Sequence, residues 1–177
     1  SGIAHPKVLS KLQELNEETF IGYGLDEYSK KAEKYIKEVI KCDSADIHFL
    51  VGGTITNKVL ISHALKPYEA VISCDSGHIN VHETGTIEQS GHKVLTVPNE
   101  LGKMKVEDLE KVLKAHTDEH MVKPKMVYIS NSTEFGTVYK YKELKEISEF
   151  CKEHKLYLFM DGARLGAALA STECDYK

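Results

Sequence analysis

A carboxylate and a guanidinium stand three residues apart in the segment Asp161-Gly162-Ala163-Arg164. The residues before them, Leu156 to Met160, are apolar and of strand length, so Asp161 is expected at the carboxyl end of a buried strand. A buried carboxylate is costly unless a cation pairs with it, and a planar guanidinium binds carboxylates through two parallel hydrogen bonds. Arg164 is the one arginine among 23 positively charged residues, which indicates that its geometry matters as well as its charge. An aspartate helix cap beside a surface arginine is the alternative interpretation.

A second candidate is the turn Gly52-Gly53-Thr54, which follows the apolar segment Asp46 to Val51 and precedes a helical pattern. The first backbone N–H groups of a helix, together with its dipole, bind phosphate, and glycines let the ligand come close. The turn matches neither the Walker loop nor the dinucleotide fingerprint. A tight turn without a ligand is the alternative.

The third candidate is His78, in the segment His78 to Glu83. His78 and His82 are four residues apart and would share a helix face, as zinc ligands do. No third ligand at metal spacing follows, and we therefore predict that no metal binds. An imidazole that stacks on a flat cofactor, or one that is packed and hydrogen-bonded, is favoured instead.

These three features together describe one kind of ligand. A phosphate-binding turn, a histidine that could stack, and a strand-end aspartate with an arginine suit a flat, phosphorylated, positively charged ring. Pyridoxal phosphate is such a molecule.

The elements that must position these residues alternate between strands and helices, after two helices at the start of the chain. The first is expected within His5 to Phe20, and the second after Asp26 as its N-cap. Strands are predicted at Asp46–Val51, Ala70–Cys74, Lys93–Val97, Lys125–Ser130 and Leu156–Met160, and further helices at Thr54–Ala64, Val106–His116 and Tyr141–His154. This order predicts an α/β fold, a mainly parallel sheet with helices on both faces. No repeat or linker divides the chain, so one domain, or part of one, is expected.

The composition argues against a nucleic-acid-binding or membrane-spanning protein. The chain has 177 residues, of which 41% are hydrophobic, and a formal net charge of −4. Such a chain can bury a core, and it has no basic surplus that would attract nucleic acid. No apolar run is long enough to span a membrane. The four cysteines include no Cys-x-x-Cys pair, which favours reduced thiols and a cytoplasmic location.

The sequence resembles one group of pyridoxal-phosphate enzymes with the aspartate-aminotransferase fold: the low-specificity L-threonine aldolases and β-eliminating lyases. The order of five segments carries this resemblance over nearly the whole chain. They are Tyr23-Gly24-Leu25-Asp26, Gly52 to Asn57, His78 to Glu83 with Gly85, Ser130 to Thr137, and Asp161 to Arg164.

The resemblance implies a role for each candidate. Gly53 and Thr54 would hold the cofactor phosphate, His78 would stack on the ring, and Asp161 would pair with the ring nitrogen. Arg164 would bind the substrate carboxylate or the cofactor side of it, and with His78 it would serve catalysis. The implied reaction cleaves the Cα–Cβ bond of β-hydroxy amino acids, turning threonine into glycine and acetaldehyde. A homo-oligomer, dimer or tetramer, is implied as well. Glu83, Thr133 and the turn at Tyr23 would lie nearby, without separate roles.

Two features of the family are expected to be missing from residues 1–177. The lysine that carries the cofactor follows the Asp-Gly-Ala-Arg segment after a further strand, and a small C-terminal domain comes later still. Lys177, the one lysine after Arg164, is not expected to take that place. The chain would then be most of the large, cofactor-binding domain. A β-eliminating lyase or aminotransferase of the same fold, or a non-catalytic fragment, are the alternatives.

Overall fold

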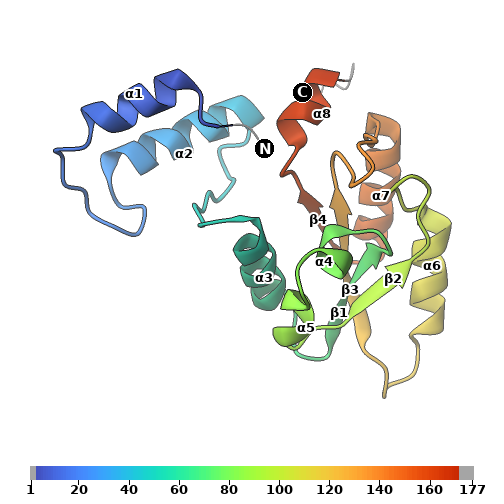
Figure 1. Ribbon diagram of the computed structural model, residues 1–177. Helices are drawn as coiled ribbons and strands as arrows, with labels where there is room; N and C mark the ends of the chain where they lie inside the picture. Colours follow the sequence, from blue (N-terminus) through green and yellow to red (C-terminus); the bar gives the residue numbers. More distant parts are fainter. Residues whose placement is uncertain (1–2, 172–177) are drawn as a thin grey trace. The chain divides into compact units, whose positions relative to one another are not determined.

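The computed structural model describes residues 3–171, which form two compact units. One unit runs to Phe49 and the other begins at Leu50 (Figure 1). Lys177 and one of the four cysteines, Cys174, for which the sequence favours a reduced thiol, lie outside the described residues. Within residues 3–171, no helix combines the length and the apolar character needed to cross a membrane.

The first unit consists of helices α1 (Pro6–Glu14) and α2 (Glu27–Ile40) with the turn between them. Asp26 caps α2 as predicted: its Oδ1 accepts hydrogen bonds from the backbone N–H groups of Tyr28 and Ser29, at 2.9 and 2.8 Å. The hydroxyl of Ser29 also donates to this carboxylate, and these bonds lower the pKa of Asp26. Helix α1 is shorter than the predicted segment, because the acidic residues that follow it oppose the negative end of the helix dipole.

The second unit is built on one parallel sheet. Its strands are β1 (Glu69–Cys74), β2 (Val94–Val97), β3 (Lys123–Ser130) and β4 (Tyr157–Asp161), in the order β2-β1-β3-β4. Every pairing between neighbours is parallel. Four of the five predicted strands are confirmed within two residues at either end, and so is the α/β fold class.

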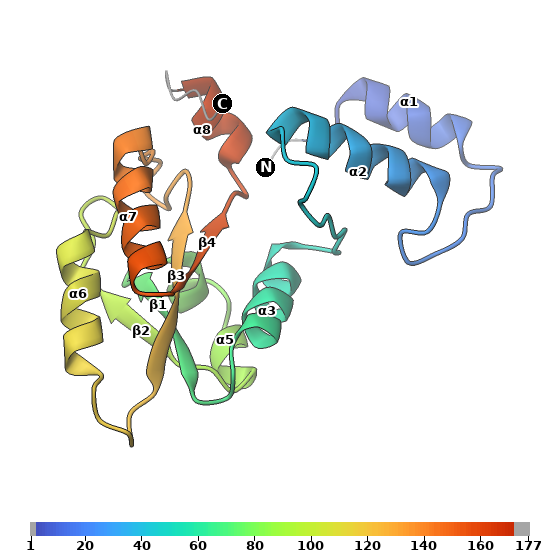
Figure 2. The ribbon, with the colours of Figure 1, turned by 180° about the vertical axis from the view of Figure 1, so that it is seen from behind.

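Helices cover both faces of this sheet. Figures 1 and 2 show α6 (Val106–Ala115) and α7 (Tyr141–Glu153) on one face. The other face carries α3 (Gly53–Ala64) and two short helices, α4 (His78–Val81) and α5 (Thr86–Gln89). A final helix, α8 (Leu165–Ser171), follows β4.

Two apolar clusters fix this layering, because successive strand residues point to opposite faces. Ala70 and Ile72 of β1 pack in the cluster that includes Leu109 of α6 and Ile147 of α7. Their neighbour Val71 packs in the second cluster, which includes Ile61 of α3, Ile79 of α4 and Ile87 of α5, and Leu65 just after α3. The centre of the sheet is therefore buried on both faces.

The predicted strand at Asp46–Val51 is wrong. These residues form no hydrogen-bonded ladder, and the side chains of Phe49 and Val51 are 53% and 93% exposed. An apolar run becomes a strand only beside a partner, and no strand within residues 3–171 pairs with this segment. The expectation of a buried strand before Asp161 is also corrected. Strand β4 lies at the edge of the described sheet, with a neighbouring strand on one side only, and its residues Tyr157 and Leu158 are exposed.

Candidate functional site

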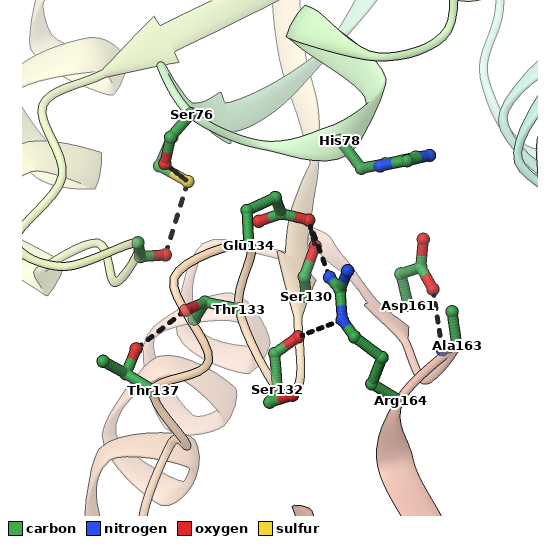
Figure 3. A network of polar contacts seen from close by, with 12 residues as sticks. Ser76, His78, Ser130, Ser132, Thr133, Glu134, Thr137, Asp161, Ala163 and Arg164 are labelled. Carbon is green, nitrogen blue, oxygen red and sulfur yellow. Dashed lines mark hydrogen bonds and ion pairs between the residues drawn. The ribbon is translucent and has the colours of Figure 1, made fainter. Parts of the chain in front are cut away.

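The carboxyl ends of the parallel strands bring three of the candidate residues, His78, Asp161 and Arg164, to one edge of the sheet (Figure 3). His78 follows β1, Glu134 follows β3, and Asp161 is the last residue of β4. Figure 3 shows His78, Asp161 and Arg164 around the ends of these strands. Ligands of open parallel sheets bind at this edge, because the free loop ends converge there.

Asp161 is held through both carboxylate oxygens. Its Oδ2 accepts a hydrogen bond from the hydroxyl of Tyr128 at 2.6 Å, and its Oδ1 accepts one from the backbone N–H of Ala163 at 3.0 Å. Tyr128 lies on the neighbouring strand β3 and is 1% exposed. Burial, with the nearby carboxylate, raises the pKa of Tyr128, so its hydroxyl stays a donor at any ordinary pH. This bond ties Asp161 at the end of β4 to the neighbouring strand β3.

Arg164 is anchored to the loop that follows β3. Its Nε donates to the carbonyl of Ser132 at 3.2 Å, and its Nη2 donates to Oε1 of Glu134 at 3.0 Å. The hydroxyl of Ser130 donates to the same Oε1 at 2.9 Å. Arg164 is thus tied to this loop although it lies at the surface. Because 44% of the Arg164 side chain is still exposed, its guanidinium remains within reach of a ligand.

Glu134 is a residue at this edge to which the sequence assigned no role. Its side chain is 10% exposed, and its Oε2 is buried without a hydrogen-bond partner. The sequence signal was its place just after a strand, in Ser132-Thr133-Glu134. Its contact with Arg164 joins residues 30 positions apart, and no spacing rule gives such a contact.

The loop that carries Glu134 is seated on the turn after β2. The hydroxyls of Thr133 and Thr137 lie 2.7 Å apart, and both donate to the carbonyl of Leu101. Gly102 lies so close that an added Cβ would stand 2.6 Å from the side chain of Thr133. This close approach packs the loop that carries Glu134 against the turn at Gly102.

His78 opens the short helix α4, and Gly77 before it has no room for a side chain: a Cβ there would lie 2.0 Å from Oγ of Ser73. The imidazole is partly exposed, and its Nε2 lies 3.8 Å from Oε1 of Glu83. The rings of His78 and His82 are 5.4 Å apart. Residues 3–171 contain no group of three His, Cys, Asp or Glu side chains placed to hold a metal ion.

Gly53 and Thr54 form the first turn of α3, and no side chain caps this end of the helix. Both residues are exposed, and a Cβ built at Gly53 would meet nothing within 4 Å. The first N–H groups of α3 thus have no side-chain cap and face open space, and anion binding there stays a prediction. Asn57, one turn further along, donates to Oε1 of Glu83 at 2.7 Å, so α3 is linked to the residue beside His78.

The donor set fits a phosphorylated pyridinium that carries an amino acid. It offers helix N–H groups for phosphate, an imidazole for a ring face, a fixed carboxylate for a ring nitrogen, and a guanidinium for a carboxylate. Two buried carboxylate oxygens of the described residues, Oε2 of Glu83 and of Glu134, have no partner. The described residues therefore form an α/β fold with a candidate ligand site beyond the carboxyl ends of a parallel sheet.

The chain belongs to the β-eliminating lyase family, whose sequence profile matches residues 8–177. The low-specificity L-threonine aldolase of Pseudomonas aeruginosa is 33% identical over 176 residues, which is 98% of this chain and 50% of that protein. The chain therefore spans about half the length of the curated relatives it matches. The resemblance seen in the sequence is confirmed at the level of the family.

Solved structures agree with this assignment. A structure of Leishmania major threonine aldolase superposes with a TM-score of 0.96 at 51% identity, covering 99% of this chain and 51% of that one. A pyridoxal-phosphate-bound C–S lyase from Staphylococcus hominis superposes with a TM-score of 0.65 at 16% identity, over 89% of this chain and 41% of that one. The latter likeness concerns the fold alone, which is that of the type I pyridoxal-phosphate enzymes.

Proposed function

We propose that this protein is a pyridoxal-phosphate-dependent lyase of the threonine aldolase type, which cleaves the Cα–Cβ bond of β-hydroxy amino acids. With threonine the products are glycine and acetaldehyde. The observation that carries the proposal is the pair of Asp161, fixed by the buried Tyr128, and Arg164, anchored by Glu134, at the ligand edge of the sheet. The 51% identity to a threonine aldolase supports the choice of reaction.

The cofactor would be held by residues of three elements. The N–H groups of Gly53 and Thr54 would bind its phosphate, His78 would lie against its ring, and Asp161 would pair with the ring nitrogen. When bound, pyridoxal phosphate supplies an electron-withdrawing ring that stabilises negative charge on the amino acid's α-carbon.

The chain's own groups prepare the site for that chemistry. Asp161 presents a carboxylate fixed by two donors, and such a carboxylate favours a proton on a ring nitrogen placed against it. Arg164 would bind the carboxylate of the amino acid through guanidinium N–H groups. Glu134 and the carbonyl of Ser132 occupy its Nη2 and Nε, which sets the plane of the guanidinium before substrate arrives.

Other lyases of the same fold remain a second candidate, favoured by the family profile, whose description is β-eliminating lyase. An aminotransferase would use the same large domain. The products separate these reactions: an aldolase gives an aldehyde and glycine, whereas β-elimination gives a keto acid and ammonia. A non-catalytic fragment, the third reading, would give neither.

We further propose that the protein acts as a homo-oligomer, dimer or tetramer, on a small amino acid, and that it works in the cytoplasm. The buried cysteines Cys74 and Cys151 support this location, since both are free thiols. Neither nucleic acid nor a membrane is proposed as a partner.

The test is product analysis of the protein as its complete gene encodes it, supplied with threonine and pyridoxal phosphate. Acetaldehyde release is expected, measured by reduction with an alcohol dehydrogenase. Asp161→Ala should lower turnover by about 100-fold or more, since it removes a preorganised charge. Asp43→Asn, in the other unit, is the matched control and should leave turnover unchanged. Keto acid and ammonia as products, or full activity of Asp161→Ala, would overturn the proposal.

A further inference from the structure

The carboxylate of Glu83 is enclosed in the protein with too few partners. Its side chain is 0% exposed. Its Oε1 accepts one hydrogen bond, from Nδ2 of Asn57 at 2.7 Å, and its Oε2 has no partner. A buried carboxylate with a single neutral donor is costly. A second hydrogen-bond donor or a cation is therefore expected beside it.

The imidazole of His78 is the group that lies beside this carboxylate and can donate to it. Its Nε2 lies 3.8 Å from Oε1 of Glu83, just beyond hydrogen-bond length. The imidazole is 36% exposed whereas the carboxylate is enclosed. The imidazole thus lies between the enclosed carboxylate and the solvent.

Asn57 connects the same carboxylate to the phosphate turn. It is 2% exposed and lies on α3, one helical turn after Gly53. Glu83 therefore takes a hydrogen bond from the helix whose first N–H groups would hold the phosphate, and it faces the histidine that would lie on the ring. The two cofactor contacts are joined through one buried residue.

The surroundings keep Glu83 in place. The backbone N–H of Thr86 donates to the Glu83 carbonyl at 3.0 Å. Ile79 of α4 and Ile87 of α5 are buried on either side of it in the chain, and both pack in the cluster with Ile61 of α3. The carboxylate is thus presented from a segment whose flanking residues are packed in the core, as a positioning role requires.

We propose that Glu83 is a positioning residue: its carboxylate holds the Nε2–H of His78 and ties it to α3, so that the imidazole is set against the plane of the cofactor. This rests on the proposed function, because the ring that His78 faces is that of pyridoxal phosphate. Glu83 touches neither cofactor nor substrate and acts through His78.

The experiment measures cofactor affinity of the protein as its complete gene encodes it, by absorbance titration with pyridoxal phosphate. Glu83→Gln keeps the size and removes the charge, and it should weaken binding about tenfold, as the loss of one hydrogen bond to a charged group does. Glu88→Gln is the matched control, an exposed glutamate five residues away, and should bind like the wild type.

A second background separates positioning from a merely structural role. His78→Phe keeps a flat ring and removes the ring N–H, so in that background Glu83→Gln should change affinity by less than about twofold if Glu83 acts through His78. An equal loss in both backgrounds would overturn the inference. If Glu83→Gln does not fold, by far-UV circular dichroism, Glu83→Asp takes its place in the same cycle, because it keeps the charge but withdraws it from His78.

A spectrum without cofactor keeps this inference distinct from the proposed function. In the ¹⁵N-labelled protein, His78 should show its proton on Nε2, and Glu83→Gln should shift those resonances while Glu88→Gln leaves them unchanged. An unchanged His78 signal in Glu83→Gln would refute the positioning role. If the wild type bound no pyridoxal phosphate while His78 responded as expected, the proposed function would fail and the His78–Glu83 contact would stand.

Discussion

Replacing Tyr128 by phenylalanine tests the bond that holds Asp161. The hydroxyl of Tyr128 donates to Oδ2 of Asp161 at 2.6 Å, and the residue is 1% exposed. The substitution removes that hydroxyl and keeps the ring, which packs edge-on against Phe159 with centroids 5.3 Å apart. A hydrogen bond to a charged group contributes about 1.5–3 kcal/mol, so we expect Tyr128→Phe to lower the free energy of unfolding by that amount.

Equilibrium unfolding in urea, followed by far-UV circular dichroism, measures this loss. The chain has no tryptophan, which makes circular dichroism the natural probe. Tyr157→Phe is the matched control: Tyr157 lies on β4, is 50% exposed, and its substitution should change stability by less than about 0.5 kcal/mol. If Tyr128→Phe and Tyr157→Phe unfolded at the same urea concentration, the hydroxyl would not be holding Asp161, and the reasoning would be refuted.

Two further predictions concern packing and thiol chemistry. Gly102→Ala should destabilise the protein by about 1–3 kcal/mol more than Gly91→Ala in the same urea assay. Both glycines have positive φ, but of the two only Gly102 has a neighbour, Thr133, within 4 Å of the new Cβ. Equal losses of stability in the two variants would contradict this account. Iodoacetamide at mild pH should label Cys42, which is exposed, and spare Cys151, whose pKa burial raises to about 11; peptide mass mapping decides, and early labelling of Cys151 would count against the packing of α7. An unfolded cysteine ionises near pH 8.5, so between that pH and about 11 the folded state binds more protons, and the contribution of Cys151 to stability falls as the pH rises.

The sequence predicted the sheet well because its signals there are local. Ala70–Cys74 and Lys125–Ser130 are apolar runs between helical patterns, and each became a central strand buried on both faces. The run at Asp46–Val51 has the same local texture but lacks a partner within the described residues, and it formed no strand. A strand depends on its neighbour, and a single segment cannot report whether that neighbour is present.

The residues of the candidate site could also be predicted only in part from the sequence. Asp161, Arg164 and His78 could be placed at one edge from the sequence, because parallel strands bring their carboxyl ends together. Their partners could not be foreseen: Tyr128 meets Asp161 from 33 positions away, and Asn57 meets Glu83 from 26. Such contacts arise from strand register and helix docking, which local spacing does not encode.

The most direct test of the central claim is whether the protein, as its complete gene encodes it, binds pyridoxal phosphate covalently at this site. We predict a visible absorbance band on adding the cofactor, fixed by borohydride as a matching increase in mass, and much weaker cofactor binding in Asp161→Ala. A protein that shows no visible band and no mass increase, or an Asp161→Ala variant that binds the cofactor like the wild type, would contradict the account.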